Sequence, residues 1–154
     1  LKKDIALEET IEAFKLTHEA GLETVAYFML GSPHETPETI RETIGFAQKI
    51  DPDFVQFSIT IPYPGSELYS LAVEDECVPE KWEEYMYADL KSAANPGFET
   101  KTLSRGELME WNKKAYMSFY LRRSYVWKRL RKMTSLGELK TNVSGLRMVI
   151  DMIK

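Results

Sequence analysis

Two apolar runs alternate with amphipathic segments in the first half of the chain. The runs at residues 23–31 (ETVAYFMLG) and 53–61 (DFVQFSITI) are rich in β-branched and aromatic residues, which is typical of strands. Segments with helical spacing precede, separate and follow them, at residues 4–21, 37–51 and 66–76. This order of helix, strand, helix, strand and helix predicts parallel strands with helical crossovers, as in a barrel or a doubly wound sheet.

The helical segments also carry boundary signals. Gly21 is a suitable residue to end the first helix, and Thr36 followed by Pro37 is a typical start of the second. Each of these two helices has an apolar stripe. In the first helix the stripe contains Leu7, Ile11 and Phe14 together with His18, and in the second it contains Ile40, Ile44, Ala47 and Ile50. We expect His18 to have a structural role on its stripe.

Alternation along the strands predicts which side chains share a face. In the second strand Gln56, Ser58 and Thr60 alternate with an apolar set, Val55, Phe57, Ile59 and Ile61. In a barrel the apolar set would pack outward on helices, as would Ala26, Phe28 and Leu30 of the first strand. The polar set would then face inward with Tyr27, Met29 and Gly31, which indicates a cavity. An open sheet with one solvated face would give the same alternation.

Both strands end in turns that are suited to a ligand site. The first turn reads GSPHET (residues 31–36) and the second reads PYPGS (residues 62–66). Ligands of parallel α/β folds bind where the strands end, and a glycine such as Gly31 lets the backbone approach a ligand closely. His34 and Tyr63 are the substrate-facing candidates in these turns. An ordinary exposed turn histidine is the simpler interpretation of His34, and Tyr63 could equally cover the rim of a barrel.

The pattern changes after residue 77. Residues 78–103 read as an irregular connection with one short helix near residues 82–87. Residues 104–154 read as a helical region with stretches near 104–121, 123–133 and 136–153. We therefore divide the chain into βα units at 1–77, a connection at 78–103 and a basic helical region at 104–154.

Charge is distributed unevenly along the 154 residues. The net charge is −4, but residues 1–104 are strongly acidic and residues 105–154 are basic. The basic part mixes cations with aromatic residues, namely Arg122, Arg123, Lys128, Arg129, Arg131 and Lys132 with Tyr120, Tyr125 and Trp127. Such mixing suits binding to nucleic acid or to a membrane surface. The simpler interpretation is that the helix packs on the rest of the fold through its aromatic residues, and that the acidic and basic parts of the chain attract each other.

Composition narrows the remaining possibilities. The hydrophobic content of 44% is typical of a globular domain, and no apolar run reaches the roughly 20 residues that span a bilayer. A single cysteine, Cys77, excludes an internal disulfide and a thiolate metal site of the chain's own, and it favours the cytoplasm. The first residue, Leu1, suggests a piece of a longer chain.

The two turn motifs and the strands before them resemble a known family. The stretch AYFMLGSPHETPETIRETIGFAQKIDPDFVQFSITIPYPGSELY is similar to the later strands of radical S-adenosylmethionine (radical SAM) enzymes. The likeness is to the cobalamin-associated branch, whose members include a tetrapyrrole cyclase. It extends through FYLRRSYVWKRLRKM to nearly the whole chain. It implies an α/β fold, namely the C-terminal fragment of a partial (β/α)6 TIM-like barrel followed by a helical C-terminal region.

The resemblance also implies a binding role for residues of both strands. By position, Tyr27, Met29 and Gly31 of the first strand and Gln56, Phe57 and Ser58 of the second would contact S-adenosylmethionine. Tyr27 stands where the family commonly has glycine, and Glu35 corresponds to a glutamate that shapes the turn. The resemblance assigns no catalytic residue and no metal ligand to this chain.

The cluster that the family uses is not provided by these residues. Its CxxxCxxC motif binds a [4Fe–4S] cluster, and a chain with Cys77 alone lacks that motif, so we expect it to be inactive by itself. The implied partners are the upstream barrel, a cobalamin-binding domain and a small-molecule substrate of the longer protein. Unpaired strand edges lead us to expect self-association of the chain. The alternative is a non-catalytic module whose basic helices bind nucleic acid or an acidic partner. Of these two partners we consider nucleic acid the less favoured.

Overall fold

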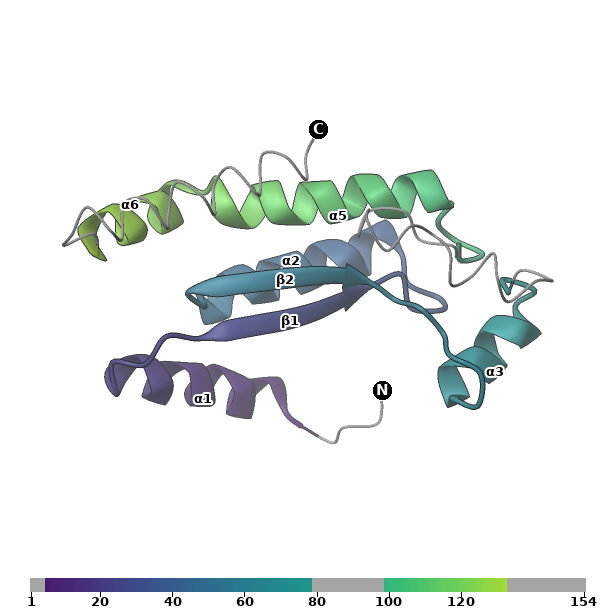
Figure 1. Cartoon of the computed structure of the whole chain (residues 1–154), viewed down its shortest axis with the longest axis horizontal. Coiled ribbons are helices and arrows are strands. Elements are labelled where there is room, and N and C mark those ends of the chain that lie inside the picture. Colours follow the sequence, from purple (N-terminus) through teal and green to yellow (C-terminus); the bar gives the residue numbers. More distant parts are fainter. Residues whose placement is uncertain (1–4, 79–98, 133–154) are drawn as a thin grey trace.

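A two-stranded parallel sheet with helices on one face forms the centre of a computed structural model of the chain (Figure 1). The structure describes residues 5–78 and 99–132. Its elements are α1 (Leu7–Glu19), β1 (Val25–Leu30), α2 (Pro37–Ile50), β2 (Phe54–Ile59), α3 (Glu67–Glu74), α5 (Arg105–Tyr120) and α6 (Arg123–Lys132). The helices predicted near residues 82–87 and 136–153 lie outside the described residues.

The strands pair in parallel, as the element order predicts. Tyr27 lies opposite Gln56 and Met29 lies opposite Ser58, and α2 connects the two strands. The α/β class is therefore confirmed. A partial barrel needs more strands than the two that the described residues contain, so it remains a prediction.

Local sequence signals explain where α2 begins and ends. The Thr36 hydroxyl accepts a hydrogen bond from the Thr39 N–H at 3.4 Å, and Pro37 occupies the first turn. At the other end Asp51 adopts a left-handed conformation with φ of 45°, one residue before Pro52. All four residues of the predicted apolar stripe, Ile40, Ile44, Ala47 and Ile50, are buried.

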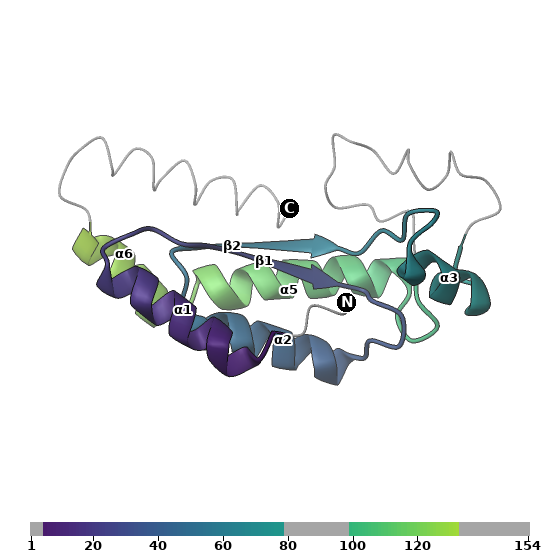
Figure 2. The same cartoon turned by 90° about the horizontal axis from the view of Figure 1, so that it is seen from below.

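The core lies between the sheet and the helices α2 and α5. Ala26 and Leu30 of β1 and Val55 and Phe57 of β2 are buried against these helices. Leu108, Ala115 and Phe119 are the main contributions of α5. Figure 2 shows α1, α2 and α5 on the same side of the strands. The predicted apolar face is thus confirmed within the strands, and the helical region shares its core with the βα units.

The prediction is less accurate at the edges of this core. Ile61 lies beyond the end of β2 and is partly exposed, whereas Thr60, expected to face a cavity, is buried. In α1, Ile11 and Phe14 pack against the core but Leu7 is exposed, and α1 makes contacts with α2. No helix in the described part of the chain is both long and apolar enough to span a membrane.

Candidate functional site

Four of the predicted site residues share the face of the sheet that lies opposite the helices. Tyr27 and Met29 of β1 stand beside Gln56 and Ser58 of β2 in the parallel register. The Tyr27 residue is 74% exposed, and Met29 is 42% exposed. The Gln56 side-chain amide donates a hydrogen bond to the Ser58 hydroxyl at 3.3 Å. We call these four residues the open face; it has an apolar column on β1 and a polar column on β2.

Phe57 and Gly31 do not belong to the open face. The Phe57 ring is buried on the helix side, 5.5 Å from the ring of Phe28 and 5.5 Å from that of Tyr116. Gly31 follows the last residue of β1 with φ of 84°, and a Cβ there would lie 3.0 Å from a methyl carbon of Leu108. The close approach at Gly31 is therefore made by α5. Phe57 supports the sheet from its helix side.

The GSPHET turn is closed by its own glutamate. The Glu35 carboxylate accepts hydrogen bonds from the backbone N–H groups of Gly31 and Ser32, and the Thr102 hydroxyl donates to the Glu35 carbonyl. Partial burial raises the pKa of Glu35, and the two backbone N–H bonds oppose that shift. This arrangement supports the turn-shaping role that the resemblance implies. It also means that these two N–H groups already have an acceptor.

His34 and Tyr63 both lie in turns that follow strands. His34 adopts φ of 64°, its side chain is 70% exposed, and its Nδ1 lies 3.8 Å from the Asp75 carboxylate. The Lys101 ammonium lies 2.7 Å from the same carboxylate, and this hydrogen bond lowers the pKa of Asp75. Tyr63 is exposed, and its carbonyl accepts a hydrogen bond from the Ser66 hydroxyl at 2.7 Å. Asp75, which follows α3, thus links this helix to Lys101, far along the chain.

The chain's one thiol lies near this ion pair. The Cys77 S–H donates to the Asp75 carbonyl at 3.2 Å, and burial raises the thiol's pKa. No group of three or more His, Cys, Asp or Glu side chains in residues 5–78 and 99–132 could hold a metal ion. Cys77 therefore has the features of a structural thiol.

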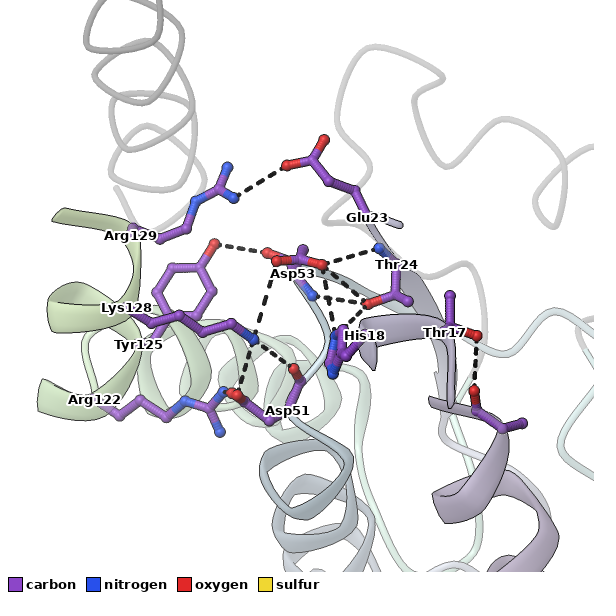
Figure 3. A network of polar contacts seen from close by, with 11 residues as sticks. Thr17, His18, Glu23, Thr24, Asp51, Asp53, Arg122, Tyr125, Lys128 and Arg129 are labelled. Atoms are coloured by element: carbon purple, nitrogen blue, oxygen red, sulfur yellow. Dashed lines mark hydrogen bonds and ion pairs between the residues drawn. The ribbon is translucent and has the colours of Figure 1, made fainter. Parts of the chain in front are cut away.

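A polar network fills the opposite end of the strands (Figure 3). The buried Asp53 carboxylate accepts hydrogen bonds from the N–H and the hydroxyl of Thr24 and lies 3.6 Å from His18 Nε2. His18 Nε2 is also within 3.1 Å of the Thr24 hydroxyl, which agrees with the structural role expected of this histidine. The Lys128 ammonium lies 2.9 Å from the Asp51 carboxylate and 4.0 Å from that of Asp53.

Two cations of α6, Lys128 and Arg129, and Arg122 just before it form ion pairs within the fold. Arg122 pairs with Asp51, and Arg129 lies 3.5 Å from Glu23 and stacks over the ring of Phe54. These contacts confirm attraction between the acidic and basic parts of the chain. The outward side of α6 instead presents Trp127, 58% exposed, with the Arg131 guanidinium 5.2 Å from its ring. Tyr120 and Tyr125 pack in the core, as the packed-helix interpretation predicts, whereas Trp127 does not.

Sequence comparisons relate the chain to parts of longer enzymes. It is 35% identical over 121 residues to an uncharacterized methyltransferase of Pyrococcus horikoshii, a match that covers 78% of this chain and 25% of that protein. It is 30% identical over 129 residues to the anaerobic magnesium-protoporphyrin IX monomethyl ester cyclase of Cereibacter sphaeroides, covering 82% of this chain and 20% of the cyclase. The corresponding cyclase of Rubrivivax gelatinosus is 25% identical over 126 residues.

The matches cover most of this chain but only part of each relative. No protein-family profile matches the chain. The chain spans a quarter or less of the length of the relatives, all of which are named as enzymes. Homology to part of an enzyme is therefore established, and the activity of any whole protein is not.

Proposed function

We propose that the chain forms the carboxyl-terminal part of a radical SAM oxidoreductase and supplies one wall of its adenosylmethionine pocket. The open face carries this proposal. Its four side chains project from a sheet whose other face is covered by helices, and they lie on two strands that end in neighbouring turns. Ligand sites of parallel α/β folds occur at this end of the strands.

The chemistry of the open face suits an adenosyl group. The Tyr27 ring and the Met29 thioether offer apolar surface to a flat heterocycle, and sulfur and aromatic groups make favourable contacts of this kind. Gln56 and Ser58 offer a carbonyl, an amide and a hydroxyl at the register positions beside them, which could bind ring nitrogens or ribose hydroxyls. His34 and Tyr63 would face the substrate from the turns.

The number of cysteines shows whether this chain could bind the iron–sulfur cluster of the family. A [4Fe–4S] cluster needs several thiolates, and the sequence contains only Cys77. The residues of this chain therefore do not fit the cluster, and we propose that another part of the longer protein binds it while the open face contacts the adenosylmethionine. The bound cluster and adenosylmethionine supply one-electron chemistry, while the residues described here bind and orient. Cobalamin use rests on the resemblance alone.

The relatives support an enzyme of this kind without identifying its reaction. One is named as a methyltransferase and two are named as cyclases, so the matched region is shared by proteins with different outcomes. A region that serves different reactions is more consistent with a common cofactor pocket than with a substrate-specific site. The proposal therefore concerns adenosylmethionine and leaves the substrate undefined.

Binding of adenosylmethionine to the full-length protein tests the proposal. The protein would be prepared without oxygen with its cluster intact, and its affinity would be measured by equilibrium dialysis for the wild type, Gln56→Ala and Tyr27→Ala. We expect each substitution to weaken binding about tenfold, equivalent to about 1.4 kcal/mol. Both side chains are exposed, so neither substitution should disturb the core.

Glu42→Gln is the matched control, because Glu42 is exposed on α2. Its affinity should equal that of the wild type. Unchanged affinity in both open-face variants, with the cluster still present by its absorption spectrum, would remove the pocket assignment. If the control also loses affinity for adenosylmethionine, the weaker binding comes from the preparation and not from the open face.

A further inference from the structure

The backbone of β2 has one edge that faces β1 and one that faces away from it. Phe54 N–H donates to the Thr24 carbonyl, and Thr60 N–H donates to the Leu30 carbonyl. In a parallel strand the N–H and C=O groups of alternate residues point toward the same edge. Val55 and Phe57 therefore direct their backbone N–H and C=O groups away from β1, toward what would be a free edge, and the carbonyl of Asp53, just before β2, meets a side chain of α6.

Tyrosine hydroxyls of α5 occupy this outer edge. The Val55 N–H donates to the Tyr120 hydroxyl oxygen at 3.0 Å, and the same hydroxyl donates to the Val55 carbonyl at 2.8 Å. The Tyr116 hydroxyl makes the same pair of bonds to Phe57, both at 3.1 Å. One hydroxyl can donate and accept at the same time, so each tyrosine satisfies both groups of one residue.

Two further contacts extend the arrangement. The Asn112 amide donates to the Phe57 carbonyl at 3.0 Å, and the Tyr125 hydroxyl donates to the Asp53 carbonyl at 2.9 Å. Asp53 N–H donates to the Thr24 hydroxyl at 3.1 Å. The outward N–H and C=O groups of Val55 and Phe57, and the carbonyl of Asp53, thus all bond to side chains.

The repeat lengths of helix and strand make this match possible. Tyr116 and Tyr120 are one helical step of four residues apart, about 6 Å along the axis. Val55 and Phe57 are two strand residues apart, about 6.6 Å. The two tyrosine rings are nearly parallel, with centroids 6.2 Å apart. Because the residue numbers rise along α5 as they fall along β2, the helix runs antiparallel to the strand.

We infer that Tyr116, Tyr120 and Tyr125 close the outer edge of β2 to strand pairing, so that a further strand can join this sheet only at β1. An unpaired edge is a template for another strand, and the tyrosines occupy the groups that such a strand would need. The backbone groups of Val25, Tyr27 and Met29 on the outer edge of β1 have no hydrogen-bond partner among the described residues.

Amide hydrogen exchange of the chain, followed by NMR, tests the closure residue by residue. In the wild type we expect the Val55 and Phe57 amides to exchange slowly, like the inner-ladder amide of Gln56. Tyr120→Phe should speed exchange about tenfold or more at Val55 and leave Phe57 slow, and Tyr116→Phe should do the reverse. Tyr63→Phe removes an exposed hydroxyl and should change neither amide.

Sedimentation of Tyr116→Phe/Tyr120→Phe tests the consequence for assembly. The double variant should form larger species than the wild type and Tyr63→Phe at equal concentration. Unchanged sedimentation together with unchanged exchange at Val55 and Phe57 would overturn the inference. If the variants unfold, the wild-type protein alone still tests the inference. Wild-type amides of Val55 and Phe57 that exchange as fast as those of an unstructured peptide would show that the edge of β2 is open, and would overturn the inference.

Discussion

The carboxylate of Asp53 accepts hydrogen bonds from both the backbone N–H of Thr24, at 3.1 Å, and the hydroxyl of Thr24, at 3.3 Å. Each residue immediately precedes a strand, and both are buried. The pair therefore fixes the start of β1 relative to the start of β2. A buried carboxylate with several donors is stable only while those donors remain in place.

Thr24→Val should destabilise the fold. The substitution keeps the shape of the side chain but removes the hydroxyl that bonds to Asp53 twice, as a donor to its carboxylate and as an acceptor from its N–H. We expect a loss of about 1–3 kcal/mol in the free energy of unfolding, measured in urea. Thr43→Val, whose hydroxyl bonds only within α2, should cost less than about 0.5 kcal/mol. Equal losses would mean that the pair contributes little.

Gly31→Ala should be more destabilising than Gly65→Ala. The two glycines have nearly the same φ, 84° and 85°, so both substitutions carry the left-handed penalty of about 1–2 kcal/mol. Only at Gly31 does a new Cβ meet a neighbour, Leu108, and overpacking costs about 1–3 kcal/mol more. Urea unfolding of the two variants isolates this difference. Equal losses in the free energy of unfolding would show that Leu108 of α5 moves aside without an energetic cost.

The pH dependence of stability should differ between the wild type and Glu35→Gln. Because burial raises the folded-state pKa of Glu35 above its ordinary value of 4.5, the folded protein holds this proton more tightly than the unfolded chain. Relative to Glu35→Gln, the wild type should therefore lose stability as the pH rises from below 4.5 through the folded-state pKa. Urea titrations across this window measure the effect. A relative gain with rising pH would show that the two backbone N–H bonds dominate burial.

Asp51→Asn should lower stability in a salt-dependent way. Asparagine tolerates the left-handed conformation of Asp51, so the substitution removes the charge that pairs with Arg122 and Lys128 but keeps the backbone. Asp51 is partly exposed, and we expect a loss of about 1 kcal/mol at low salt that shrinks in 1 M NaCl. Glu12→Gln, which removes an exposed pair with Lys15, is the control and should have almost no effect.

The sequence predicts those features that depend on local periodicity. Alternation along the strands identified Val55 and Phe57 as covered and Tyr27 and Gln56 as a separate face, because the strand period alone decides which side chains share a face. Spacing in α2 likewise identified its buried face. The starts and ends of the elements followed from Thr36, Pro37 and Gly21, whose effects are confined to adjacent residues.

Features that depend on distant segments could not be predicted in this way. Nothing near Gly31 indicates that Leu108 will pack against it, and nothing near Arg122 identifies Asp51 as its partner. Tyr116 and Tyr120 have the spacing of an ordinary helical face, and their hydroxyl bonds become visible only when α5 is placed beside β2. One signal was available, since tyrosine in a buried stripe must find a partner for its hydroxyl.

The dependence of β2 on α5 has a consequence for synthesis. A ribosome adds residues from the N-terminus at roughly 5–20 per second, so β1, α2 and β2 emerge well before Tyr116 and Tyr120. During that interval the nascent strand has neither its covering helix nor the hydroxyls that occupy its edge. The unit therefore cannot finish folding in the order in which it is made, and a chain terminated before residue 105 would expose the aggregation-prone edge of β2 that Tyr116 and Tyr120 occupy.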